Sequence, residues 1–221
     1  MAKQKTYTWK DPSGPLKLLF GVMGLNIAAR VASLAVAAVY GPAAVLVSGE
    51  EVLNAAQAMR ALADVTKFAV TLISIAAGWW VYRANANAHT FRPKLINSPF
   101  GAVAWYIVPL AGLYKPYQAM RETWAASALT GERGRDGILR YWWGIYLASN
   151  VVATLANMPA LSSISFFPAV VSDLLAIGCS VMLIQVARII TRMQLAKHAS
   201  RVFSDAEPPP PNVLERLTEG V

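Results

Sequence analysis

The stretch WYIVPLAGLYKPYQAM, from Trp105 to Met120, decides how the whole chain is organised. It is apolar enough for a membrane, but Pro109 and Pro116 interrupt it. Its hydrophobic part, residues 100–113, is about two-thirds of the ~20 residues that an α-helix needs to cross a bilayer. The topology therefore depends on whether this segment crosses the bilayer or enters and leaves on one side.

The composition is that of a membrane protein. Of the 221 residues, 56% are hydrophobic and 14% are charged, whereas soluble domains carry about a quarter charged residues. A single cysteine, Cys179, excludes an internal disulfide, and with only two histidines the sequence predicts no metal site and no cofactor. The net charge of +8 comes from short basic clusters beside apolar runs, which favours membrane orientation over nucleic-acid binding.

Four apolar runs predict transmembrane helices, at about 18–40, 67–82, 141–157 and 167–190. The second can extend backward through VLNAAQAMRALADV, which has helix-forming composition. The first exceeds the ~7–15 apolar residues of a signal peptide, so an uncleaved span is expected. These spans define an all-α membrane domain over 18–200, between a basic cytoplasmic amino terminus (1–17) and a proline-rich flexible cytoplasmic tail (201–221).

The distribution of lysine and arginine decides between two topologies. If residues 100–113 crossed as a fifth, kinked span, ten bases would lie on the side opposite the amino terminus. If the segment returns to the side it came from, 17 of the 20 bases share the cytoplasmic side with both termini. The positive-inside rule favours the second arrangement, so we predict a re-entrant or interfacial segment at 99–127.

The two prolines supply a mechanism for the break. Pro109 removes a helix hydrogen bond and clashes with the preceding turn, while Pro116 suits the first turn of a new helix. Because lipid cannot satisfy a broken backbone, the segment is expected to pack against the spans.

Polar residues inside the spans are candidate functional groups. Asn26 and Arg30 share a face of the first span, and Asp173 lies at a compatible depth in the fourth, which predicts an Arg30–Asp173 pair. Such a pair either fixes helix register or belongs to an ion or substrate path. In the third span, a stripe of four polar residues is expected to bond neighbouring helices. Its members are Tyr146, Asn150, Thr154 and Asn157.

Aromatic residues flank the predicted cytoplasmic interface. They form two groups, Trp79, Trp80 and Tyr82 at the end of the second span, and Tyr141, Trp142 and Trp143 at the start of the third. Such placement is typical of an aromatic belt that anchors helices at the headgroup level.

Three stretches resemble a bacterial membrane family known as domain of unknown function DUF4328. They are YRANANAH (82–89), the segment from Ser98 to Ser127, and RYWWGIYLASN (140–150). The matching positions are Arg83, Asn87, Ser98, Pro99, Trp105, Pro109, Leu113, Pro116, Tyr117, Glu122, Trp124, Trp142 and Trp143. The resemblance implies a polytopic protein of the bacterial inner membrane and no particular reaction. Some relatives carry an amino-terminal zinc ribbon, which this chain lacks.

Arg83 and Asn87 lie four residues apart, on one face of a helix. We expect them to bond the carbonyls freed at Pro109, or Arg83 to pair with Glu122, so that the broken segment is clamped against the second span.

Catalytic signatures are missing: there is no phosphate loop, nucleophile elbow or metalloprotease motif. The sequence therefore predicts a non-enzymatic scaffold or accessory subunit of a membrane complex, whose basic surface meets anionic lipid or a membrane-protein partner. A small transporter or channel that uses the broken helix and Arg30/Asp173 is the alternative. A lipid-modifying enzyme is disfavoured, because the sequence offers no acid–base pair for catalysis.

Overall fold

A computed structural model describes residues 6–40, 49–129, 136–158 and 166–205 of the chain. All regular structure within these ranges is helical, as the sequence predicts. The elements in chain order are α1 (Ser13–Tyr40), α2 (Gly49–Phe91), α3 (Pro99–Ala104), the 3-10 helix η1 (Ala111–Leu113), α4 (Lys115–Ser127), α5 (Gly137–Ala156) and α6 (Phe166–Asp205). The predicted flexible tail lies outside the described residues from position 206 onward.

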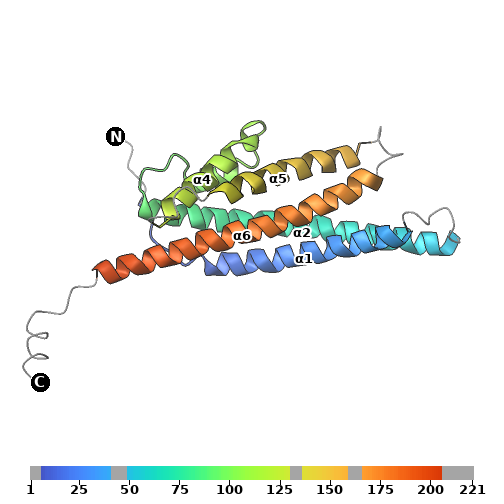
Figure 1. Ribbon diagram of the computed structural model, residues 1–221, viewed down its shortest axis with the longest axis horizontal. Helices are drawn as coiled ribbons and strands as arrows, with labels where there is room; N and C mark the ends of the chain where they lie inside the picture. The colour runs from blue at the N-terminus through green and yellow to red at the C-terminus, as the bar shows by residue number, and fades with distance from the viewer. Residues whose placement is uncertain (1–5, 41–48, 130–135, 159–165, 206–221) are drawn as a thin grey trace, which may run out of the picture.

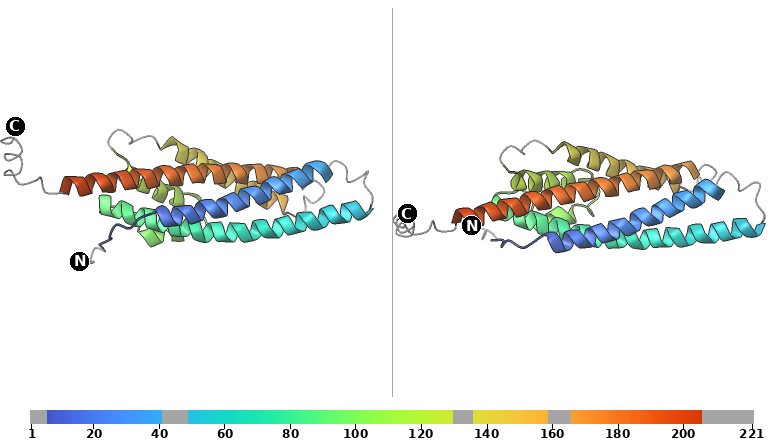
Figure 2. Two further views of the ribbon diagram at one scale, coloured as in Figure 1. Left: turned by 90° about the horizontal axis from the view of Figure 1, so that it is seen from below. Right: turned by 60° about the horizontal axis from the view of Figure 1, so that its bottom comes forward.

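Four long helices run along one axis (Figures 1 and 2). Helix α1 packs against both α2 and α6, and α5 packs against the other side of α6. The short helices α3 and α4 contact α2 near the end of the bundle where α2 ends and α5 begins. This end, where α1 also begins and α6 ends, is called the α4 end below.

Among the described residues, three helical segments are long and apolar enough to cross a membrane: Ser13–Val39 in α1, Ala56–Phe91 in α2 and Phe167–Val202 in α6. The backward extension of the second span is confirmed, because α2 starts at Gly49 and has 43 residues, a length of ~65 Å. Helix α5 has 20 residues but carries Arg140 in its first turn and Asn150 in its middle, and it is not among the three. A crossing by α5 stays a prediction.

The hydrophobic core lies toward the α4 end. There Leu19, Trp80, Met120, Leu139 and Ile190 are fully buried at one junction of α1, α2, α4, α5 and α6. The far half of the bundle instead exposes apolar side chains, among them Val39, Phe68, Ile75, Val151, Phe167 and Leu174. Large exposed apolar surfaces mark contact with a membrane or another protein.

The predicted aromatic belt is partly wrong. Trp79, Tyr82 and Tyr141 are exposed, as a belt requires. Trp80, Trp142 and Trp143 are buried in the hydrophobic core and cannot face lipid. The sequence places all six near one level, but only packing decides which side of each helix turns inward.

The stretch quoted first folds as a helix, a break and a second helix. Helix α3 starts with Pro99 in its first turn, and the Ser98 hydroxyl accepts a hydrogen bond from the Gly101 N–H at 3.1 Å. After Pro109 the chain makes a tight γ-turn at Leu110, with φ 60° and ψ −51°, in which the Ala111 N–H donates to the Pro109 carbonyl. Helix α4 then begins at Lys115, with Pro116 in its first turn as predicted.

The break is close-packed against its neighbours. A Cβ on Gly112 would lie 3.1 Å from the Trp105 carbonyl oxygen, so a larger residue here requires the neighbouring backbone to shift slightly. The indole Nε1 of Trp143 on α5 donates to the Leu113 carbonyl at 3.0 Å. Helix α5 therefore supplies a hydrogen bond to backbone that the broken helix leaves unpaired.

Candidate functional site

Arg30 and Asp173 form the ion pair that their positions predict. The Arg30 Nη1 donates to Asp173 Oδ1 between α1 and α6, and both side chains are mostly buried, at 14% and 21% exposure. Arg30 Nε also donates to Asn26 Oδ1 at 3.3 Å, and Asn26 Nδ2 lies 3.5 Å from Ser180 Oγ on α6. The structure thus brings Asn26, Arg30 and Asp173 into one polar contact that joins two helices.

The polar stripe of α5 does not bond neighbouring helices, so that prediction is wrong for the described residues. Asn150 Nδ2 donates to the Tyr146 carbonyl, Thr154 Oγ1 to the Asn150 carbonyl, and Asn157 Nδ2 to the Ala153 carbonyl. All three side chains are exposed. Their donors turn back onto the helix, as such short polar side chains do where the described residues leave them exposed.

A buried polar network joins four segments at the α4 end. Gln194 on α6 donates through Nε2 to the Ala84 carbonyl at 2.7 Å and to Ser127 Oγ at 3.0 Å, and its Oε1 accepts from Asn87 Nδ2 at 3.3 Å. Asn87 also pairs with the backbone of Lys10, donating to its carbonyl at 2.8 Å and accepting from its N–H at 3.1 Å. Gln194, Asn87 and Ser127 have no exposed surface. The amino-terminal segment, α2, α4 and α6 are therefore held together by satisfied polar bonds.

The predicted clamp of the broken segment by Arg83 and Asn87 is wrong. Asn87 bonds Lys10 and Gln194 instead of the carbonyls near Pro109, and no ion pair joins Arg83 to Glu122, both of which the structure describes. Glu122 Oε2 accepts from the N–H and the side-chain amide of Asn97, at 3.1 and 2.9 Å. Asn97 Oδ1 in turn accepts from Trp105 Nε1 at 2.9 Å. Asn97 therefore ties the two halves of the broken segment to each other, through Trp105 after α3 and Glu122 on α4.

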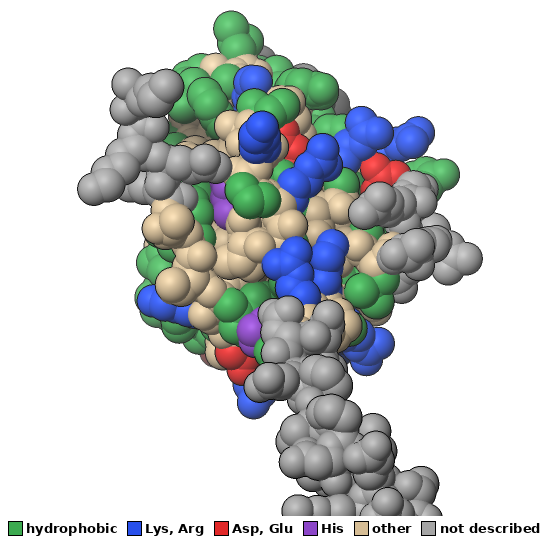
Figure 3. Space-filling model, turned by 90° about the vertical axis from the view of Figure 1, so that its left-hand side faces the viewer, with side chains coloured by type: hydrophobic (Ala, Val, Ile, Leu, Met, Phe, Trp, Pro, Cys, Tyr) green, Lys and Arg blue, Asp and Glu red, His purple; other side chains and the backbone are tan. Residues whose placement is uncertain are grey.

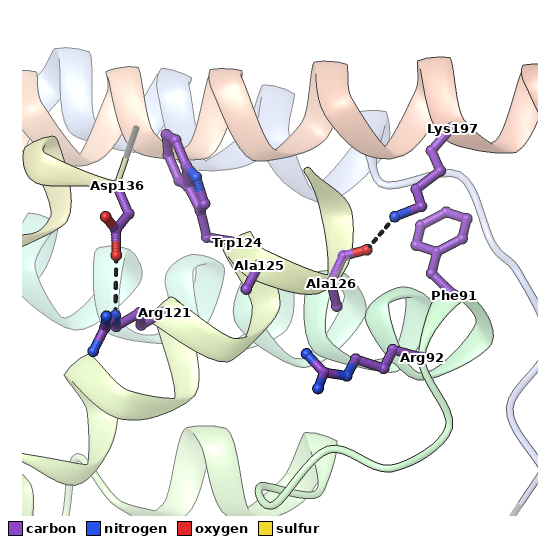
Figure 4. A pocket seen from close by; sticks show the side chains of 8 residues that line it. All are labelled: Phe91, Arg92, Arg121, Trp124, Ala125, Ala126, Asp136 and Lys197. Atoms are coloured by element: carbon purple, nitrogen blue, oxygen red, sulfur yellow. Dashed lines mark hydrogen bonds and ion pairs between the residues drawn. The ribbon is translucent and has the colours of Figure 1, made fainter. Parts of the chain in front are cut away.

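A cleft of about 440 Å³ opens at the α4 end, between α2, α4 and α6 (Figure 4). Arg92 follows α2, Arg121 and Trp124 come from α4, and Lys197 comes from α6. The remaining lining residues are Phe91, Ala125, Ala126 and Asp136. The cleft therefore combines three cations, one carboxylate and an aromatic wall.

The three cations of the cleft differ in their hydrogen-bond partners and in their exposure. Arg121 Nε donates to Asp136 Oδ2 at 3.0 Å, and the Arg121 side chain is 60% exposed. Lys197 Nζ donates to the Ala126 carbonyl at 2.7 Å and to the Ala128 carbonyl at 3.2 Å, where α4 ends, and lies over the Phe91 ring. Arg92 is exposed. With Asp136 as the one carboxylate, the lining keeps a net positive charge.

Lysine and arginine side chains also gather on the face at the α4 end (Figure 3). They come from the amino-terminal segment and from the helix ends that meet there. The exposed members on these segments are Lys10, Lys17, Lys94, Arg140, Arg192 and Arg201. The α4 end is therefore the basic end of the bundle.

One polar atom in the cleft lacks a protein partner. Trp124 is 4% exposed, and its buried Nε1 has no hydrogen-bond partner among the described residues. A buried indole N–H without an acceptor is unfavourable, so an acceptor that entered the cleft and reached this N–H would stabilise the position. Such a set of donors and cations suits an anion.

The described residues contain no group of three histidine, cysteine or acidic side chains that could hold a metal ion. A second cleft of about 260 Å³ lies beside the break, lined mainly by residues 106–113 and by Tyr146, Leu147 and Asn150 of α5. It holds no charged side chain. Neither cleft is lined by Arg30 or Asp173.

Sequence reasoning missed the residues that matter most at the basic end. Arg121, Lys197 and Gln194 were not singled out, because basic and polar residues near a helix end are common. One signal was available. Thr191 and Gln194 interrupt an apolar helix three residues apart, so they share a face, and Thr191 accepts from the buried Trp80 Nε1 at 3.2 Å.

A family model described as domain of unknown function, DUF4328, matches residues 44–192, which is more than half of the chain. The match takes in α2 to α5 and most of α6, with the broken segment at its centre. No match was found among curated proteins or among solved structures.

Proposed function

The chain belongs to the DUF4328 family of unknown function, and from that premise we propose that it is a non-enzymatic scaffold or accessory subunit of a membrane complex. The polar stripe on α5 carries this proposal. Asn150, Thr154 and Asn157 are exposed in this chain, and polar side chains are unfavourable against lipid. A helix from a membrane-protein partner, packed on that side of α5, gives them a polar neighbour.

The exposed side of α5 also has the shape that helix partners need. Gly144 and Ala148 are exposed and lie four residues apart, on the side of α5 that points away from the polar stripe. Small residues at this spacing let two helices approach closely in a membrane. Partner helices therefore find hydrogen-bonding groups on one side of α5 and room for close approach on another.

The proposed placement in the membrane follows from charge and exposure. Helices α1, α2, α5 and α6 cross, both termini lie in the cytoplasm, and the basic end lies at the anionic cytoplasmic leaflet. The broken segment enters from that side and returns. Two observations support this: Ile107 and Leu110 at the tip of the break are more than four-fifths exposed, and several backbone N–H groups of the break are bonded locally, as Gly112 is to Val108. A bacterial inner membrane is the proposed location.

The test is site-directed photo-crosslinking in intact cells. A photoreactive amino acid at Thr154 is expected to give a discrete protein adduct, whereas the same group at Leu174 on α6, an exposed apolar position, gives lipid adducts only. Changing Asn150 to Leu and Asn157 to Leu together weakens the adduct from position 154. Lipid adducts alone at both positions overturn the scaffold proposal.

A small transporter is the second candidate, favoured by the Arg30–Asp173 pair with Asn26 beside it in the interior. Replacing the pair by Met and Leu removes both charges while it retains apolar packing. If the protein is a transporter, cells with this variant should behave like cells that lack the protein, although the crosslink from position 154 still forms. A scaffold retains both.

A further inference from the structure

The basic cleft has features that no structural role explains. Trp124 keeps a buried N–H without an acceptor among the described residues, and the exposed Arg92 lines the same cleft (Figure 4). Together with Arg121 and Lys197, these residues form a positively charged, partly enclosed space with an aromatic wall.

We propose that this cleft binds the phosphate group of an anionic phospholipid. Phosphate oxygens accept from guanidinium and indole N–H groups, and arginine matches their planar geometry better than lysine does. A volume of about 440 Å³ is within the range of ligand pockets and holds a headgroup.

The lipid source rests on the proposed function, because it needs the basic end at the membrane surface. Basic pockets between membrane helices on the cytoplasmic side suit anionic headgroups. Free phosphate has the same chemistry, so the two sources are separated by experiment.

Substitutions in the cleft can make phosphate binding either tighter or weaker, because the lining also contains Asp136. Its carboxylate already accepts from Arg121 Nε and repels an incoming phosphate. Asp136→Asn keeps an acceptor for Arg121 but removes the negative charge, so phosphate binding becomes tighter. Arg92→Gln removes a cation from the lining and makes binding weaker.

The measurement is native mass spectrometry of the purified full-length protein in a nonionic detergent. Phosphatidylglycerol and phosphatidylcholine with identical acyl chains are added in parallel, and the fraction of protein that carries one lipid is followed. The wild type is expected to prefer phosphatidylglycerol. Arg92→Gln weakens that binding about tenfold, and Trp124→Phe, which keeps the aromatic ring and removes the N–H, about fivefold.

Two matched variants serve as controls. Arg140→Gln removes one exposed charge from the same end without touching the cleft, and Trp142→Phe alters another buried tryptophan outside it. Both should retain wild-type binding. If Arg140→Gln weakens binding as much as Arg92→Gln, the attraction is a general property of the basic end and the cleft proposal is overturned.

Inorganic phosphate forms the second arm, read by thermal unfolding in the same detergent. The site is supported if phosphate raises the unfolding temperature of the wild type but not of Arg92→Gln, and if phosphate displaces phosphatidylglycerol. Stabilisation by phosphate without any preference for phosphatidylglycerol overturns the lipid source. The site is overturned if the two lipids bind equally and phosphate does not change the unfolding temperature. The scaffold proposal is tested separately, by the crosslink from position 154.

Discussion

Arg30 on α1 and Asp173 on α6 are 143 residues apart in the chain and form one ion pair in the bundle interior. The pair fixes how these two helices meet, because a shift along either axis separates the charges. Removing one member strands the other in a poorly solvated site, at a cost of about 3–5 kcal/mol.

This pair predicts a non-additive response to substitution. Arg30→Met and Asp173→Leu should each lower the unfolding free energy in mild detergent, and the double variant should recover much of the loss. Denaturant titration of the four proteins measures the coupling. Strictly additive losses would show that the two residues do not depend on one another.

Gln194 is expected to be the most sensitive polar residue of α6. Gln194→Leu leaves the Ser127 hydroxyl and the Asn87 amide without one of their partners, which should cost about 1–3 kcal/mol for each group stranded. Gln185→Leu, an exposed glutamine on the same helix, is the control. In thermal unfolding, Gln194→Leu should have a clearly lower midpoint temperature than Gln185→Leu. Equal midpoint temperatures would show that the buried network does not stabilise the fold.

Leu110 carries backbone strain, since its φ of 60° is unfavourable for a side chain with a Cβ. Leu110→Gly relieves that strain and should raise stability by about 1 kcal/mol, although an apolar side chain is lost. Ile107→Gly removes a similarly exposed side chain from a residue without positive φ and should lower stability. A loss in both variants of equal size would mean that the γ-turn is not strained.

The proposed topology predicts which positions react with a membrane-impermeant thiol reagent. Cys179 is first replaced by Ala, and single cysteines are placed at 95, 130 and 210, and at Asn54 near the start of α2. The first three should be reachable only from the cytoplasm and Asn54→Cys only from the opposite side. Reaction at position 130 from the side of Asn54 would make the broken segment a fifth crossing.

The sequence predicted the helices well because their signals are local. Apolar runs, the backward extension of α2, and the break and restart at Pro109 and Pro116 depend on neighbouring residues, so one chain suffices to find them. The Arg30–Asp173 contact was also within reach, since charges inside apolar helices have few favourable partners.

The errors share a physical cause. Asn87 bonds Lys10, 77 residues away, and Gln194, 107 residues away, in place of the break. Trp80 and Trp142 face the core rather than lipid, and Asn150, Thr154 and Asn157 of the α5 stripe face outward. Each outcome depends on which helix lies beside which, and a single sequence does not contain that information. The cleft was missed for the same reason, because Arg92, Arg121 and Lys197 come together only in the folded chain.

The bond from Trp143 to the Leu113 carbonyl also orders events during synthesis. The broken segment precedes α5 in the chain, so the Leu113 carbonyl has no indole N–H to accept from until α5 is made and packs beside it. When α5 packs against the break, Trp143 supplies that donor. The break therefore reaches its final hydrogen bonding only after a helix that follows it in the chain has packed.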